Sequence, residues 1–167
     1  MSYRIFTDAT SDLPAAFAEQ LHVTVLPMGF TMEEKEYFYI PGRSDMPIET
    51  FFAKMREGIG VTTAQVNTFA FIEAFEPVLQ SGEDILYVGF SSKLSGTHQS
   101  AITAAAQAKG VVRVVDSLNV CVGERVLVEC ALRLAEKGLG AVEIADQICA
   151  LRDRVCVVGL LDTLEYL

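Results

Sequence analysis

Apolar runs of strand length alternate with helix-length segments along this 167-residue chain, and this alternation constrains the fold more than any other feature. The clearest runs are residues 3–8, 85–90, 111–116 and 155–161. Continuous apolar strands separated by helices are typical of a parallel sheet buried between two layers of helices. The chain is therefore predicted to be an α/β protein, with a parallel sheet and helices on both faces.

The segments between these runs carry weaker signals. Residues 23–28 read as one further strand and residues 35–40 as a hairpin arm, whereas residues 61–67 alone read as a capping loop between helices. Pro47 is expected at the first position of a helix. Further helices are expected over residues 101–109, 123–137 and 142–151. A stripe at helical spacing indicates core packing and comprises Phe71, Ile72, Phe75, Val78 and Leu79.

Composition and charge exclude some classes of function. A net charge of −9 argues against nucleic-acid binding, because phosphates are neutralised by a basic face. No uninterrupted apolar run reaches the length of a membrane span, and the N-terminus enters a strand pattern without a signal-peptide layout. We expect a cytoplasmic protein with no membrane span.

The four cysteines do not form a metal-binding pattern. Cys121, Cys130, Cys149 and Cys156 contain no C-x-x-C pair, and no histidine lies near them in the sequence. Each stands in an apolar pattern, so we expect reduced thiols in the core and no metal site.

Polar clusters follow three of the predicted strands. They begin at Asp8, at Ser91 and at Asp116. Ligands in open α/β sheets bind at the carboxyl ends of the strands, so these clusters are candidate site elements.

The cluster Ser91–Thr97 precedes a helix and is rich in hydroxyl groups and glycine. Such a turn places free N–H groups at the positive end of the helix, which suits an anion. The alternative is that Ser95 only caps the helix. The loop lacks the Gly-Lys-Ser/Thr of a nucleotide-binding loop and the Gly-x-Ser-x-Gly of a nucleophile elbow.

These segments, taken in order, resemble the DegV family of bacterial fatty-acid-binding proteins. Residues 7–14 (TDATSDLP) resemble its opening motif, Thr63-Ala64-Gln65 its Thr-Ser-Gln motif, and residues 91–101 (SSKLSGTHQSA) its LSGT segment. Val115-Asp116-Ser117 and residues 162–167 (DTLEYL) also match. The resemblance implies a Rossmann-like first domain over residues 1–153. Residues 154–167 would then be the first strand and helix start of a second domain that is mostly missing.

The resemblance also implies a function. Family members hold a long-chain fatty acid between two domains and present it to a separate fatty-acid kinase, so the chain would be a lipid carrier without cofactor or enzymatic activity. Thr63 and Ser95 would grip the carboxylate. Secondary ligand contacts are expected from Gln65, Ser92, Gly96, His98, Asp8 and Asp116.

Two residues depart from the family pattern. Ala64 replaces a serine, and His98 replaces a tyrosine. If His98 lies beside the carboxylate, its protonation should favour ligand binding at mildly acidic pH, and otherwise it is a packing histidine. If the acyl tail lies in a tunnel between two domains, this chain supplies only one wall of that tunnel. The apolar surface of that wall would then be exposed and would favour self-association.

Two other classes of function remain open at this point. One is an enzyme for a small carboxylated or phosphorylated substrate, with Asp8, His98 and Asp116 as acid/base candidates. The other is a pure interaction domain.

Overall fold

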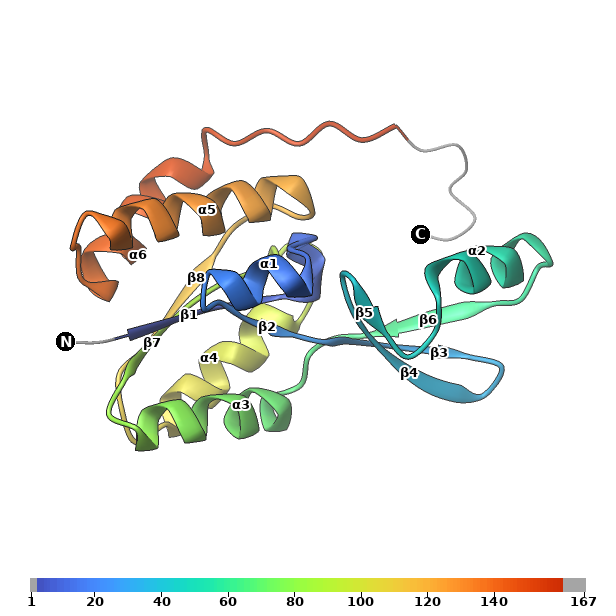
Figure 1. Ribbon diagram of the computed structural model, residues 1–167, viewed down its shortest axis with the longest axis horizontal. Coiled ribbons are helices and arrows are strands. Elements are labelled where there is room, and N and C mark those ends of the chain that lie inside the picture. Colours follow the sequence, from blue (N-terminus) through green and yellow to red (C-terminus); the bar gives the residue numbers. More distant parts are fainter. Residues whose placement is uncertain (1–2, 161–167) are drawn as a thin grey trace.

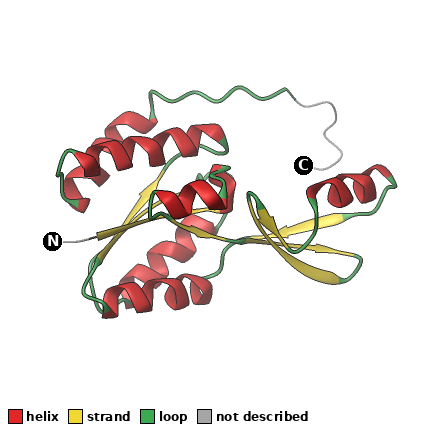
Figure 2. Ribbon diagram, in the orientation of Figure 1, coloured by secondary structure: helices red, strands yellow, loops and turns green. Residues whose placement is uncertain are grey.

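A parallel sheet between helices forms the larger part of the molecule, and a second sheet extends from it (Figures 1 and 2). The computed structural model describes residues 3–160, so the predicted helix start at 162–167 lies outside the described part. The elements are β1 (Tyr3–Asp8), the short 3-10 helix η1 (Ala9–Ser11), α1 (Ala15–Gln20), β2 (Thr24–Leu26), β3 (Met28–Met32), β4 (Lys35–Ile40), β5 (Arg43–Ser44), α2 (Ile48–Arg56), β6 (Val61–Ala64), α3 (Thr68–Gln80), β7 (Asp84–Gly89), α4 (Thr97–Gln107), β8 (Val112–Asp116), α5 (Val122–Glu136) and α6 (Ala141–Arg152).

The parallel sheet has the strand order β2-β1-β7-β8. Phe6 of β1 pairs with Thr24 of β2 on one side and with Tyr87 of β7 on the other. The chain winds outward in opposite directions from β1 and β7, so the topological switch point lies between their carboxyl ends. Ligand sites of open α/β sheets form at such a point.

Helices cover both faces of this sheet, as predicted (Figure 1). One core joins sheet residues such as Leu86 and Val88 to α5 and α6, including Leu127 and Ile144. The other core contains the predicted aromatic stripe of α3. Phe71 packs at 5.0 Å from the ring of Tyr87.

The second sheet is antiparallel, has the order β5-β4-β3-β6, and was predicted only as a hairpin arm. The expected single strand over residues 23–28 is wrong: β2 ends at Leu26 and β3 begins at Met28. Pro27, which has no N–H for a ladder, separates them. The capping loop expected at residues 61–67 is also wrong in part, because residues 61–64 form β6 and pair with β3.

α2 covers one face of the antiparallel sheet and builds a third small core. Phe30 of β3 stacks on Tyr37 at 5.2 Å and meets the edge of Phe51 of α2 at the same distance. Pro47 was predicted to be the first residue of this helix, but it stands at the N-cap of α2, one residue before the first helical residue, Ile48.

Residues 155–160 form no strand in the structure, so the strand predicted for 155–161 is wrong over its described part. A strand requires a ladder partner, and these residues pair with neither sheet. Val157 instead packs against the start of α5, where its Cγ2 lies 2.3 Å from the point that a Cβ on Gly123 would occupy.

The cysteines are free thiols, but the prediction that they lie in the core is confirmed only in part: Cys130 packs against the core beneath α5 and α6, whereas Cys149 and Cys156 lie outside it. Cys121 and Cys130 are half-buried, and Cys149 and Cys156 are exposed. Among residues 3–160, no three histidine, cysteine or acidic side chains form a possible metal site. No helix in that range is long and apolar enough to cross a membrane.

Candidate functional site

The loop after β7 and the start of α4 place the predicted hydroxyl groups together at the switch point. Ser95 Oγ accepts a hydrogen bond from the backbone N–H of Thr97, the first residue of α4, at 3.2 Å. The predicted capping role of Ser95 is therefore present, although the formal cap position is Gly96.

The end of β6 lies against this helix start. Val66 N–H donates to Thr97 Oγ1 at 3.2 Å, and Gln65 Nε2 donates to Ser100 Oγ at 3.3 Å. The Gln65 amide fills the space above Gly96, where a Cβ would lie 2.0 Å from Gln65 Oε1. These contacts join the Thr63–Gln65 segment to the Ser95 loop, two segments that are distant in the sequence.

A pocket of about 450 Å³ opens at the N-terminus of α4. It is lined by Ser92, Ser95, Gly96, His98, Gln99 and Ile102. Four of the predicted site residues thus share one wall. His98 is only 9% exposed, and its buried Nδ1 has no hydrogen-bond partner among the described residues. The role of His98 in ligand binding stays a prediction.

Thr63 lines a different cavity, which the sequence alone did not reveal. This cavity of about 250 Å³ lies between the antiparallel sheet and α2. Its lining comprises Met28, Gly29, Phe30, Tyr39, Ser44, Met46, Ile48, Phe51 and Thr63. Most of these side chains are apolar, so the cavity suits a hydrocarbon chain, with the Thr63 hydroxyl as one of its few polar groups.

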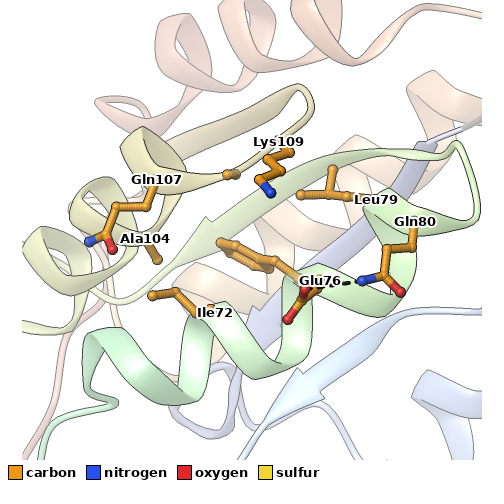
Figure 3. Close-up of a pocket in the computed structure, with 9 residues that line it drawn as sticks. Ile72, Glu76, Leu79, Gln80, Ala104, Gln107 and Lys109 are labelled. Carbon is orange, nitrogen blue, oxygen red and sulfur yellow. Dashed lines mark hydrogen bonds between the residues drawn. The ribbon is translucent and has the colours of Figure 1, made fainter.

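A third cavity of about 240 Å³ lies between α3 and the C-terminal end of α4 (Figure 3). Ile72 and Leu79 contribute apolar surface, while Glu76 accepts a hydrogen bond from Gln80 at 3.0 Å. It contains none of the predicted site residues. The C-terminal end of a helix carries partial negative charge, which disfavours a carboxylate there.

Asp116, at the end of β8, holds the Ser91–Thr97 loop in place by a hydrogen bond to its backbone. Its Oδ1 accepts from the N–H of Ser92 at 3.1 Å and from that of Leu118 at 3.0 Å. Partial burial acts to raise the pKa of Asp116, but hydrogen bonds from Ser92 and Leu118 and the nearby His98 outweigh it, so the pKa is lowered.

This lowered pKa predicts a pH-dependent contribution to stability. The folded state binds the Asp116 proton less tightly than the unfolded state does. The carboxylate therefore stabilises the fold at pH values above its ordinary pKa, which is near 4. That contribution is lost as the pH falls through the lowered folded-state value. We expect Asp116→Asn to cost below about 1 kcal/mol at pH 7, because water screens this half-exposed group. The difference from wild type should shrink below about pH 4.

Urea unfolding of the two proteins from pH 7 to pH 3 measures this difference. Asp146→Asn, which changes an exposed carboxylate on α6, is the matched control. An Asp116→Asn difference that stays constant with pH would contradict the assignment.

Asp8, the other predicted acidic residue, is fully buried behind the site. Its Oδ1 accepts from Thr10 N at 3.0 Å and from Thr10 Oγ1 at 2.5 Å. Its Oδ2 accepts from Tyr87 OH at 2.5 Å and from Phe90 N at 3.1 Å. The Tyr87 ring reaches Asp8 through the space beside Gly89, which has no side chain. A Cβ on residue 89 would lie 2.0 Å from the Tyr87 hydroxyl oxygen, so a larger residue would block this contact. Asp8 thus holds together the ends of β1 and β7.

A buried partner of this network, Glu124, was not predicted as a functional residue. Thr7 Oγ1 donates to its Oε1 at 3.0 Å, and its Oε2 lies 2.8 Å from Thr10 Oγ1. Burial, and then the charge of Asp8, raise the pKa of Glu124 well above its usual value. The single Thr10 hydroxyl hydrogen cannot serve both carboxyl groups at once, so Asp8 and Glu124 compete for it as acceptors.

The sequence carried a signal for the burial of Glu124. Leu127, Val128 and Ala131 follow it at positions i+3, i+4 and i+7 on α5, and all three are buried. Helical periodicity therefore places Glu124 on the apolar face. An acidic group there marks a buried polar network.

Comparisons with known proteins agree with this architecture. The model of the DegV family, described as uncharacterised proteins, matches residues 2–167. A DegV domain-containing protein of Clostridium perfringens is 33% identical over an alignment of 168 positions, which covers 98% of this chain and 57% of that protein.

Solved structures give the same result. A Thermus thermophilus DegV family protein, described by its fatty-acid binding, superposes with a TM-score of 0.83 and 31% identity, covering 92% of this chain and 54% of that one. A Thermotoga maritima protein described as revealing a fatty-acid-binding function gives a TM-score of 0.80 at 25% identity, with coverages of 92% and 56%. The chain thus spans little more than half the length of these relatives.

Proposed function

Because the chain belongs to the DegV family, we propose that it binds a long-chain fatty acid and acts as a lipid carrier rather than as an enzyme. Thr63 and Ser95 hold the carboxylate in this proposal, and a separate fatty-acid kinase receives the presented head group. The acyl chain is the only ligand, and no cofactor takes part.

The supporting observation is the junction of a polar helix start with an apolar cavity. Val66 and Gln65 bond to the first turn of α4, and Thr63, on the same strand end, lines the apolar cavity. A fatty acid has the matching chemistry, namely a charged acceptor at one end and a hydrocarbon chain at the other. Hydrogen bonds to a charged group contribute about 1.5–3 kcal/mol each, so two hydroxyl donors orient the ligand firmly.

The geometry gives the alternative enzyme less support. Neither Asp8 nor Asp116 lines the pocket that contains His98. Asp8 is fully buried, and both of its oxygens are occupied by hydrogen bonds within the protein. A general acid or base has to reach the substrate directly or through one water molecule.

Native mass spectrometry of the chain expressed in bacteria distinguishes the classes of function. A co-purified acyl chain favours the carrier. Turnover of small carboxylated or phosphorylated substrates without bound lipid would favour the enzyme. If the chain shows neither bound lipid nor turnover, an interaction domain is the remaining class.

The head-group assignment predicts the effect of two substitutions. We expect Thr63→Ala and Ser95→Ala each to raise the Kd for decanoate by about 10- to 100-fold, because each removes one hydrogen bond to a charged acceptor. Decanoate is soluble enough for an NMR titration that measures weak binding. Thr103→Val, on the exposed face of α4, is the control. Unchanged affinity in both alanine variants, with an intact circular dichroism spectrum, would refute the assignment.

A further inference from the structure

The hydroxyl of Thr97 connects the two halves of the proposed head-group site. Thr97 is fully buried at the start of α4. Its Oγ1 has two hydrogen-bond partners among the described residues: the N–H of Val66 at 3.2 Å and Ser95 Oγ at 3.0 Å. The N–H of Thr97 also donates to Ser95 Oγ at 3.2 Å.

The hydrogens of this cluster can be assigned by counting. A hydroxyl group has one hydrogen to donate and two lone pairs that accept. The Val66 N–H occupies one lone pair of Thr97, so the Thr97 hydrogen has Ser95 Oγ as its acceptor. Buried hydroxyl groups are almost always hydrogen-bonded, which rules out the reverse arrangement, in which that hydrogen has no partner.

Ser95 then accepts two hydrogen bonds from Thr97, one from the backbone and one from the side chain. Both of its lone pairs are occupied, and its own hydrogen has no partner within the described chain. Ser95 is half-buried and lines the pocket that also contains His98. Its free hydrogen is therefore available to a ligand in that pocket.

We propose that Thr97 is a positioning residue that makes Ser95 an obligatory donor toward the ligand head group. The proposal rests on the proposed function, because it identifies which atom donates to the carboxylate. An ionised carboxylate only accepts hydrogen bonds, so a serine locked as a donor selects it over head groups that only donate. The same Thr97 oxygen holds Val66, three residues after Thr63, and so keeps both hydroxyl ligands in one arrangement.

A double-mutant cycle on decanoate binding tests this role. Thr97→Val keeps the shape of the side chain and removes the hydroxyl, and we expect it to raise Kd about tenfold, or 1.4 kcal/mol. In the Ser95→Ala background the same substitution should change Kd by about threefold or less, because no serine hydrogen is left to orient and only the hydrogen bond to Val66 remains to be lost. Thr97→Ser should restore binding to within about twofold of wild type. Thr103→Val controls for loss of a threonine hydroxyl from the same helix.

The same four proteins without ligand test the hydrogen bond itself. Thr97→Val should lower Tm more in the wild type than in the Ser95→Ala background, with a difference of about 2–4 °C. Equal effects of Thr97→Val in both backgrounds, in binding and in Tm, would show that Thr97 acts only through Val66 or packing and would overturn the proposal. If the wild type binds neither decanoate nor palmitate, the fatty-acid function fails together with the ligand half of this proposal. The Tm cycle then decides separately whether Thr97 donates to Ser95.

Discussion

Palmitate is expected to bind this 167-residue chain about four powers of ten more weakly than it binds a longer relative such as the Thermus thermophilus protein. An acyl tail of about fifteen methylenes contributes roughly 12 kcal/mol when it is fully buried, at about 0.8 kcal/mol for each methylene. This chain spans 54% of that relative. If the remaining part supplies the second wall of the tunnel, about half of the burial, or 6 kcal/mol, is lost, and each 1.4 kcal/mol changes Kd tenfold.

The length of the tail provides the control. Decanoate has about half as many methylenes, so the same reasoning predicts a gap of only about two powers of ten between the two proteins. A fluorescent fatty-acid displacement titration measures both ligands. A gap that does not depend on tail length would locate the difference at the head group instead.

Exposed apolar side chains near the site predict self-association of this chain. Leu94 is 63% exposed in the Ser91–Thr97 loop, and Val122 is 59% exposed at the start of α5. Apolar surface of this kind favours contact with another protein surface. Sizing chromatography run beside the titration checks this expectation. A monomer with the affinity of the longer relative would mean that the ligand site is complete within these 167 residues.

Asp8→Ala is expected to destabilise the protein by about 3–5 kcal/mol, a large part of the 5–15 kcal/mol that holds an ordinary domain together. The substitution removes the acceptor of four hydrogen bonds in a fully buried place. The donors of Thr10, Tyr87 and Phe90 lose their partner there, and each unpaired buried donor costs about 1–3 kcal/mol. Relief of the repulsion between Asp8 and Glu124 offsets part of the loss.

Asp8→Asn separates hydrogen bonding from charge. An amide accepts on its oxygen only, so if that oxygen faces Thr10, its NH2 group faces the N–H of Phe90, and two donors oppose each other. Asn at this position should therefore also destabilise the protein. Urea unfolding measures both variants, with Asp146→Ala on the exposed face of α6 as the control. If Asp8→Ala is no more destabilising than Asp146→Ala, the buried network has been assigned incorrectly.

The sequence by itself determined the parallel sheet, its helical cover and the positions of the polar loops. Continuous apolar strands and helical stripes are local patterns that the sequence displays directly. A strand that is apolar on both faces has to be covered on both faces, so these patterns predict a parallel sheet between helices. The stripe that contains Phe71 and Phe75 lies in the core as predicted. Thr63, Ser95 and His98 were likewise named from short motifs, because the chemistry of an anion site depends on residue types that a motif displays.

Only the tertiary structure decided which segments of the chain meet. β6 pairs with β3 across about thirty residues of sequence, and no local pattern in residues 61–67 indicates that pairing. Asp8 and Asp116 both follow a strand and look alike in the sequence, yet Tyr87 and Glu124 surround Asp8, while Asp116 remains half-exposed. The burial of a polar group, and therefore its pKa and its role, depends on side chains that arrive from distant parts of the chain. For the same reason the donor direction of Ser95 follows from its contact with Thr97 and from the contact of Thr97 with Val66.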